Sequence, residues 1–249
     1  ASTGVDVSLK APPKRKKRFK KSLFQVEQSP SLNLDDTFLL QLNPLKKTAF
    51  KSGDLAGFIA SDGKERQYSV AKIDGNLVLS VKKHEFGLCS TYLSKLQYKE
   101  TIPVILRRKP DFHFPKYAPA VVLIANGTGI APFLGMLAEN NGKVPTSLFL
   151  GLRKAKSYEL YKDLIERYPP SHLEIAFSQT TKKQYVQDVL EQKSKWVSQQ
   201  LENGAVFMIC GSLPMQNRVL EVLEESCKKH LQKPLSEFET LDQLKMDCY

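Results

Sequence analysis

The chain has 249 residues, of which 41% are hydrophobic and 25% are charged, and its formal net charge is +11. This length suits two domains of ordinary size, and the composition is that of a soluble globular protein. No apolar run approaches the roughly 18 residues of a membrane span, and no apolar stretch near residue 1 has the form of a secretory signal.

Residues 1–22 form a basic tail that carries most of the excess charge. It holds eight of the 37 lysines and arginines and one of the 26 acids, so its net charge is +7 and the rest of the chain carries +4. Two interpretations stay open: a solvated linker, or a tether to anionic lipid or nucleic acid. The small charge outside the tail argues against specific nucleic-acid binding by the rest of the chain.

Residues 23–115 predict a β-domain. Turn residues separate the apolar or alternating runs SLFQVEQ, DTFLLQL, RQYSVAKI, NLVLSVKK and IPVILRR. Asp74-Gly75 between two of these runs predicts a hairpin. Several short strands at this spacing are typical of an antiparallel barrel or sandwich, and we expect a barrel.

Residues 116–249 predict a second domain, which the segment 112–119 joins to the first as a hinge. Apolar strands alternate with helices expected to begin at Pro132 and to span 157–167, 184–200 and 214–230, and the strands read AVVLIA, TSLFLGL, LEIAFS and AVFMICG. This alternation predicts a doubly wound α/β fold with a parallel sheet. The expected architecture is therefore an antiparallel β-barrel followed by an α/β domain.

The segment VVLIANGTGIAPF, 121–133, predicts a glycine turn between a buried strand and a helix. Gly127 and Gly129 permit a close backbone approach, and Pro132 suits the first turn of a helix. Thr128 lies between the two glycines. Exposed N–H groups and the positive helix end could then bind a phosphate. The pattern is GxGxxP rather than GxGxxG, so a plain tight turn remains the alternative.

Small or polar residues also follow the other strands of this domain. In a doubly wound sheet the carboxyl ends of the strands line the ligand crevice. The residues at these ends are Gly151, Arg153, Ser178, Gln179, Cys210, Gly211 and Ser212. Together with the glycine turn they favour a nucleotide site at this edge.

Four further segments carry a family resemblance: RQYS at 66–69, GLCSTYL at 87–93, MICGSLPM at 208–215 and DCY at 247–249. In combination they make the chain resemble the ferredoxin–NADP reductase family from about residue 30 to 249. It is most similar to the FAD/NADPH reductase module of diflavin enzymes such as cytochrome P450 reductase and sulfite reductase flavoprotein. The resemblance implies an oxidoreductase that binds FAD and a nicotinamide nucleotide.

The first two segments imply a flavin site. The resemblance puts Arg66 at the flavin diphosphate, Tyr68 against the isoalloxazine ring and Ser69 near its N5 atom, with Gln67 between them. A guanidinium fork suits phosphate, and a ring face suits stacking. The second segment would hold the diphosphate with Gly87, Leu88, Cys89 and Ser90. Taken singly, the two segments also fit an amphipathic strand and a helix N-cap.

The last two segments imply the reacting centre. The resemblance puts Cys210 beside the nicotinamide, with Gly211 and Met215 in the same loop, and makes Tyr249 the ring that covers the flavin. Asp247 would stabilise the positive charge that develops on the nicotinamide. The predicted catalytic residues are thus Ser69, Cys210, Asp247 and Tyr249. The family often has an acid after Cys-Gly, where this chain has Ser212.

The choice of nucleotide rests on FSQTTKKQYVQ, 177–187. It keeps the family's Ser178, Lys183, Tyr185 and Gln187, but Gln179 replaces an arginine and the spacing to Tyr185 is one residue short. Arg153 and the lysines offer positive charge for a 2′-phosphate, and no acid stands ready for a ribose diol. NADPH is predicted, and NADH stays open.

The resemblance also implies an electron acceptor, either a flavodoxin-like FMN domain, a ferredoxin or a haem protein. The chain would then be the module of a longer protein, with membrane association through an upstream region or the basic tail left open. Four cysteines without CxxC spacing predict free thiols, no bound metal and a cytoplasmic location. Two rival hypotheses are a nucleic-acid-binding protein and a non-catalytic flavin-binding subunit.

Overall fold

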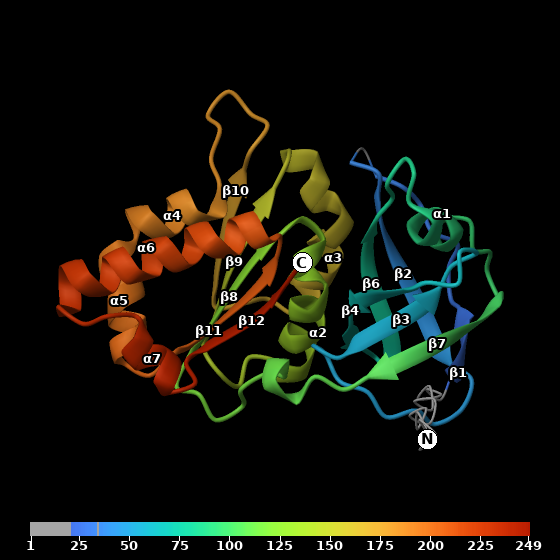
Figure 1. Ribbon diagram of the computed structural model, residues 1–249, viewed down its shortest axis with the longest axis horizontal. Coiled ribbons are helices and arrows are strands. Elements are labelled where there is room, and N and C mark those ends of the chain that lie inside the picture. Colours follow the sequence, from blue (N-terminus) through green and yellow to red (C-terminus); the bar gives the residue numbers. More distant parts are fainter. Residues whose placement is uncertain (1–20, 34) are drawn as a thin grey trace, which may run out of the picture.

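The computed structural model describes residues 21–33 and 35–249 (Figure 1). The predicted basic tail lies outside these residues, except for Lys21 and Ser22, which belong to the first strand. A seven-stranded antiparallel sheet curves into a nearly closed barrel, and a five-stranded parallel sheet lies beside it with helices on both faces. The predicted fold class is confirmed.

The barrel has the strand order β4-β3-β7-β1-β2-β6-β5. Its strands enclose a core in which alternate apolar side chains point inward, among them Phe24, Leu40 and Leu79. The short helix α1 (Leu88–Ser94) joins β6 to β7. The strands are β1 (Lys21–Val26), β2 (Thr37–Pro44), β3 (Leu55–Ile59), β4 (Glu65–Ser69), β5 (Ala71–Ile73), β6 (Asn76–Lys82) and β7 (Thr101–Arg107). The short run of β3 was not predicted, and the predicted run 66–73 divides into β4 and β5.

The predicted hairpin at Asp74-Gly75 is present between β5 and β6. Ile73 pairs with Asn76, so the turn has two residues. The φ angles of Asp74 and Gly75 are 51° and 84°, and a tight turn with two positive φ angles favours glycine and aspartate.

The parallel sheet has the strand order β10-β9-β8-β11-β12. The predicted helix 184–200 is two helices, and the chain ends in a helix and a strand that were not predicted, α7 and β12. The strands are β8 (Val121–Asn126), β9 (Thr146–Leu152), β10 (His172–Phe177), β11 (Val206–Gly211) and β12 (Leu244–Cys248). The helices are α2 (Ala131–Asn140), α3 (Glu159–Arg167), α4 (Val186–Gln192), α5 (Ser194–Glu202), α6 (Leu213–Leu231) and α7 (Ser236–Thr240).

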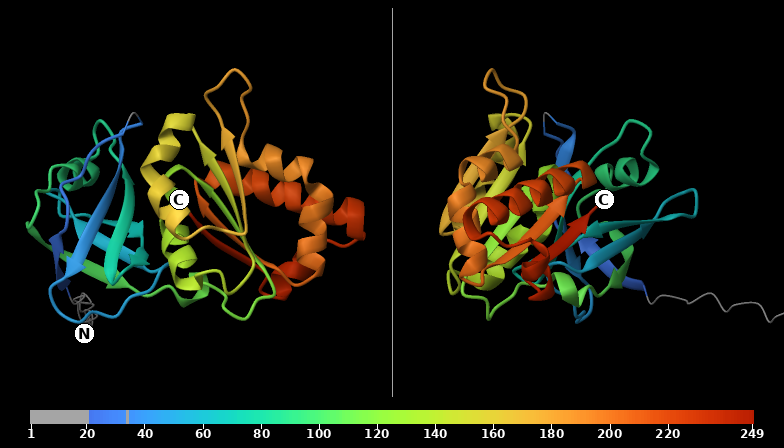
Figure 2. Two further views of the ribbon diagram at one scale, coloured as in Figure 1. Left: turned by 180° about the vertical axis from the view of Figure 1, so that it is seen from behind. Right: turned by 60° about the vertical axis from the view of Figure 1, so that its left-hand side comes forward.

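Alternation along the strands divides the side chains between two faces of this sheet. Leu123 and Met208 pack with α2 and α3 on the face toward the barrel, whereas Ile124 and Ile209 pack with α4, α5 and α6 on the other face. Figures 1 and 2 show these two layers and place the C-terminus between the barrel and the sheet.

The barrel and the α/β unit share apolar packing. Ala71 and Val78 of the barrel lie in one cluster with Phe133 of α2. A Cβ at Gly135 of α2 would lie 2.3 Å from Ser52 Oγ, so glycine permits this close approach. The predicted boundary at 115/116 falls in the connection between β7 and β8, which contains the 3-10 helix Pro110–Phe112. That boundary stays a prediction.

Candidate functional site

Three of the four side chains predicted as catalytic meet where the barrel faces the parallel sheet. Ser69 Oγ donates a hydrogen bond of 2.6 Å to Asp247 Oδ2. The second carboxylate oxygen, Asp247 Oδ1, forms an ion pair with Lys109 Nζ. Cys210 is the strand neighbour of Asp247, with which its Cα atom is paired. The hydrogen bond joins Ser69 and Asp247, which are 178 residues apart along the chain.

The parallel pairing of β11 and β12 explains this meeting. Met246 and Cys248 pack toward the cluster on the far face of the sheet, so the intervening Asp247 points toward the barrel, as Cys210 does. Backbone hydrogen bonds link Tyr249 N to Gly211 O at 3.0 Å and Leu213 N to Tyr249 O at 3.2 Å. The strand β12 is therefore the edge strand of the parallel sheet, and these hydrogen bonds continue its pairing to Tyr249.

Cys210 is fully buried. Burial, with a smaller contribution from the Asp247 charge, raises the pKa of its thiol well above the ordinary value. The thiol is thus neutral at physiological pH. It is a small polarizable group and not a thiolate nucleophile, and a ligand could contact it only after the groups that cover it move aside.

The glycine turn after β8 leads into a helix that begins within one residue of the predicted start. Gly127–Ile130 form a 3-10 helix, and α2 begins at Ala131, with the buried Pro132 in its first turn. Gly127 has a φ of 53° and open space around its Cβ position. A Cβ at Gly129 would lie 2.2 Å from Cys210 O, so this glycine lets the turn rest on β11.

Asn126, which ends β8, ties the glycine turn to the loop after β11. Its Oδ1 accepts a hydrogen bond from Ser212 N at 2.9 Å, and its Nδ2 donates to Ser212 Oγ at 3.0 Å. A side chain at Gly211, whose φ is 149°, would collide with Asn126 Oδ1. Ser212, the departure from the family's acid, therefore has a structural partner here.

A cavity of about 570 Å³ lies between the barrel and the carboxyl ends of the parallel strands. It contains eight of the residues predicted to bind the cofactors: Gly127, Thr128, Arg153, Ser178, Tyr185, Gln187, Met215 and Tyr249. Its other lining residues are Asn33, Asp35, Thr37, Lys82, Asn126, Gly151, Leu152, Ser157, Tyr161, Gln184, Val186, Ser212, Pro214 and Arg218. Four strand ends and the barrel thus share one cavity.

The charges around this cavity favour an anion. Lys82 comes from the barrel, Arg153 follows β9 and Arg218 lies on α6. Partial burial, and secondly the Arg153 guanidinium, lower the pKa of Lys82, as expected when two cations face the same space. Asp35 is the carboxylate among the lining residues, and it is hydrogen-bonded by Ser157 Oγ.

Several residues of the nucleotide prediction do not line the cavity: Gly129, Pro132, Gln179, Lys182, Lys183 and Gly211. Lys183 is exposed, and its Nζ lies 4.9 Å from the centroid of the Tyr185 ring. Gln179 donates its backbone N–H to Arg153 O. Lys82 and Arg218 line the cavity instead. The sequence holds no local signal for either, since Lys82 ends a barrel strand and Arg218 lies within a long helix.

The residues of RQYS lie on β4. Arg66 forms a two-pronged ion pair with Asp62, with distances of 2.6 and 2.7 Å, and lowers the pKa of this carboxyl to about 2. The neighbouring Gln67 is exposed. The Tyr68 ring is partly buried and packs edge-on against Phe58, with centroids 5.8 Å apart. Arg66 would have to leave Asp62, at least in part, to bind a phosphate.

The segment GLCSTYL forms a tight loop and the helix α1. A Cβ at Gly87 would lie 2.5 Å from Ser90 Oγ, so the loop requires glycine. Ser90 Oγ accepts a hydrogen bond from His84 N and donates to Gly87 O. This buried hydroxyl closes the loop. Cys89 is buried behind it, while Leu88 is exposed.

These residues fit a flavin dinucleotide in their chemistry. A guanidinium and a glycine loop are the groups that bind a diphosphate, and a partly exposed tyrosine offers a ring face. Within the described part of the chain, no group of three or more His, Cys, Asp or Glu side chains is placed to hold a metal ion.

The chain is similar to known proteins in sequence and in fold. Residues 123–221 match the family model of the oxidoreductase NAD-binding domain. Nitric oxide synthase of Bombyx mori is 33% identical over 174 residues, which cover 62% of this chain and 14% of that protein. NADPH–cytochrome P450 reductase of Dictyostelium discoideum is 31% identical over 175 residues, covering 63% and 26%. Sulfite reductase flavoprotein alpha-component of Baumannia cicadellinicola is 31% identical over 178 residues, covering 63% and 30%.

Among solved structures, ferredoxin–NADP⁺ reductase from Plasmodium falciparum has the same fold, with a TM-score of 0.75 and 18% identity over 92% of this chain and 96% of that one. The chain therefore combines the fold of a ferredoxin–NADP⁺ reductase with an α/β unit that matches the oxidoreductase NAD-binding domain. The resemblance is confirmed as a similarity in sequence and in fold to ferredoxin–NADP reductase and to the reductase parts of these relatives. The chain spans between 14% and 30% of the length of the three relatives named above.

Proposed function

We propose that the chain is a reductase module that binds FAD and NADPH and passes reducing equivalents to an acceptor. The observation that carries the proposal is the hydrogen bond between Ser69 and Asp247, with Cys210 beside it. It joins β4, the strand of the predicted flavin site, to β12, which leads into Tyr249 of the cavity lining. Bound FAD would supply the redox chemistry, taking a hydride from NADPH and releasing electrons to the acceptor.

The barrel residues would hold FAD. Arg66 would bind the diphosphate together with the backbone N–H groups of the loop at Gly87, and Tyr68 would offer its ring to the isoalloxazine. These assignments follow the family resemblance. The exposure of the Arg66 region and the tight glycine loop support them.

The cavity residues would hold the nucleotide. Gly127 and Thr128 would receive the diphosphate side, and Lys82 and Arg153 supply positive charge from opposite walls. Tyr185 offers an aromatic ring next to Ser178 and Gln187. Tyr249 lines the same cavity, so it would move aside when the nicotinamide enters.

The cluster of Ser69, Cys210 and Asp247 would orient the reacting rings and stabilise the charge that develops on them. Ser69 and Cys210 would contact the reacting rings as neutral polar groups. Asp247 would stabilise the positive charge that develops on the nicotinamide, because a nearly buried carboxylate acts strongly where water is excluded.

We infer that the acceptor is a flavodoxin-like FMN domain, a ferredoxin or a haem protein, and that the chain works as part of a longer protein. The names of the relatives and the small share of them that the chain spans support this inference. Four free cysteines support a reducing compartment such as the cytoplasm. Among the described residues, no helix combines the length and apolarity needed to span a bilayer.

The test is an anaerobic absorbance titration of the FAD-loaded chain with NADPH and, separately, with NADH. We expect NADPH to bleach the flavin band at lower concentrations than NADH. Asp247→Asn should slow the bleaching while FAD stays bound. A chain that binds no FAD, or a bound flavin that neither nucleotide reduces, would contradict the proposal, and the latter result would favour a non-catalytic flavin-binding subunit.

The preference for NADPH can be tested at Arg218, the α6 cation on the cavity wall. It pairs with Glu221, and both side chains are more than half exposed, so a phosphate can displace this weak pair. Arg218→Gln should weaken binding of 2′-phospho-AMP roughly tenfold and leave 5′-AMP unchanged. Glu221→Gln is the matched control and should not weaken either ligand. Equal loss for both ligands would remove Arg218 from the 2′-phosphate site.

A further inference from the structure

Lys109 is the fourth member of the cluster at the reacting centre. It follows β7 in the connection between the two units and forms the ion pair with Asp247 Oδ1, while Ser69 binds Oδ2. Both carboxylate oxygens of Asp247 are therefore held by groups from the barrel side. The Asp247 side chain is only 11% exposed, so this cation is its main charge compensation among the described contacts.

The position of Lys109 is fixed at its backbone as well. Its N–H donates to Asp54 Oδ1 at 2.9 Å. Asp54 is 2% exposed, accepts a second hydrogen bond from Lys51 N, and contacts His113 Nε2 at 2.6 Å. The Lys109 ammonium also lies 5.3 Å from the centroid of the Phe112 ring. A lysine held in this way loses little further freedom when it pairs with Asp247.

We propose that Lys109 is a positioning residue that holds Asp247 against Ser69 and offsets part of the carboxylate charge on the side of the flavin. The proposal rests on the proposed function, because it places the flavin beside Ser69. A reduced flavin carries more negative charge than an oxidised one. An uncompensated carboxylate nearby would oppose reduction of the flavin, and the Lys109 cation lowers this opposition.

Removal of either charge should shift the midpoint potential of the bound FAD, and the two shifts should have opposite signs. Lys109→Met leaves a lone carboxylate and should lower the potential. Asp247→Asn leaves a lone cation and should raise it. The double variant has neither charge and should return close to the unaltered protein. A merely structural ion pair would not produce opposite shifts that cancel.

Kinetics supply a second readout. Lys109→Met should lower kcat for NADPH-driven reduction more than it changes KM, because Asp247 would no longer be held at the reacting centre. Lys109→Arg keeps the cation and should restore most of kcat and the potential. A rise in KM alone would make Lys109 a nucleotide-binding residue instead and would overturn the proposal.

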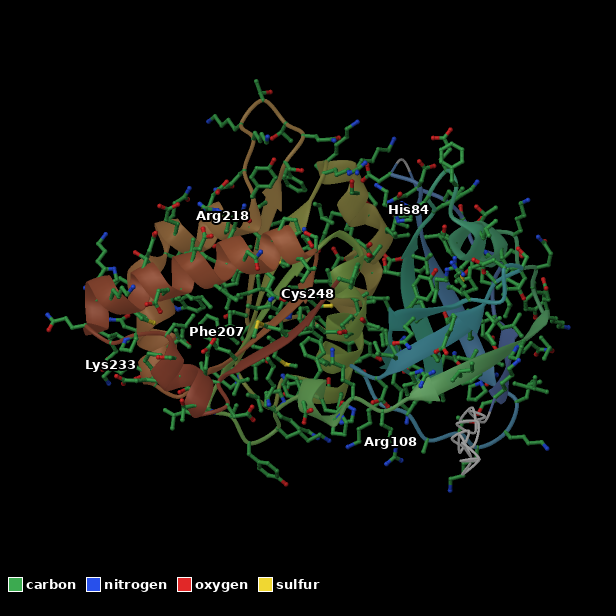
Figure 3. The ribbon with its side chains drawn as sticks, viewed as in Figure 1. His84, Arg108, Phe207, Arg218, Lys233 and Cys248 are labelled. Carbon is green, nitrogen blue, oxygen red and sulfur yellow. The ribbon has the colours of Figure 1, made fainter. Side chains whose placement is uncertain are left out.

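Arg108→Met is the matched control, since it removes one positive charge from the adjacent, exposed position. Figure 3 shows Arg108 at the lower edge of the molecule and Cys248, next to Asp247, near its middle. The control should leave the potential almost unchanged, because an exposed charge is screened by water. An equal shift in Arg108→Met would overturn the proposal.

Folding and the proposed function are checked in the same series. If Lys109→Met does not fold, the midpoint potential of FAD in Asp247→Asn alone tests the proposal. An unchanged or lowered potential in that variant would contradict the charge role of Lys109. If the unaltered chain binds FAD and is reduced by NADPH but the opposite shifts are missing, only this inference fails. If the unaltered chain cannot bind FAD, the proposed function fails with it.

Discussion

The hydroxyl of Tyr249 lies 2.7 Å from the hydroxyl of Thr128, so the last residue of the chain is tied to the glycine turn after β8. Both residues line the nucleotide cavity, and the Tyr249 residue is 63% exposed. The hydrogen bond therefore holds a ring across space that the nicotinamide would need.

Loss of this bond should make nucleotide entry easier. Tyr249→Phe keeps the ring and removes the hydroxyl, and we expect NADP⁺ to bind roughly 2- to 10-fold more tightly, the value of one net hydrogen bond. Tyr249→Ser removes the ring as well and should bind more tightly still. The measurement is calorimetric titration with NADP⁺. Tyr117→Ser, at a fully exposed tyrosine, is the control, and weaker binding by Tyr249→Phe would contradict the ring's covering role.

The two glycines of the turn should respond differently to alanine. At Gly129 a Cβ would meet the Cys210 carbonyl backbone at 2.2 Å, so Gly129→Ala should destabilise the fold by about 3 kcal/mol or more. In Gly127→Ala the new Cβ would lie in open space, so only the positive φ of 53° should lower the stability, by about 1–2 kcal/mol. Urea unfolding of both variants gives the comparison. A larger loss at Gly127 would contradict the close contact of the turn with β11.

The ion pair between Arg66 and Asp62 should compete with FAD. If Arg66 binds the flavin diphosphate, Asp62→Asn frees it and should tighten FAD binding modestly. Arg66→Gln should weaken FAD binding roughly tenfold through the lost charged hydrogen bonds. Fluorescence quenching of FAD reports both effects. Lys64→Gln, at an exposed neighbour of like charge, should change little, and weaker binding by Asp62→Asn would exclude the competition.

Stability should fall in alkaline solution through Cys227, which is fully buried. Burial, with a smaller contribution from Glu224, raises the pKa of its thiol from 9.0 to about 11. The folded state holds this proton more tightly than the unfolded state. This contribution to the free energy of unfolding is therefore complete below pH 9 and is lost as the pH rises from 9 to 11, and it amounts to at most roughly 3 kcal/mol.

Cys227→Ala tests this pH dependence. The variant should be less stable overall because it leaves a small cavity, but its free energy of unfolding should fall less steeply between pH 9 and 11. Chemical unfolding at several pH values gives both slopes. Equal slopes for the variant and the unaltered chain would contradict the assigned shift.

Local patterns predicted most of the fold. The hairpin at Asp74-Gly75 followed from two residues that tolerate a positive φ, and β8 and β11 followed from apolar runs bounded by turn residues. The strand β12 was missed because LKMDC has no strong apolar pattern and its pairing with β11 supplies the order. The interruption between α4 and α5 was missed because the helical pattern continues across Lys193.

The sequence by itself determined the order of strands and helices and the segments that resemble the reductase family, because periodicity, turn residues and short motifs are local properties. Only the tertiary structure decided that Lys109 compensates Asp247 and that Lys82 and Arg218 line the nucleotide cavity. Lys109 and Asp247 lie 138 residues apart. No local pattern records such a contact, because it arises from the packing of the barrel against the face of the parallel sheet.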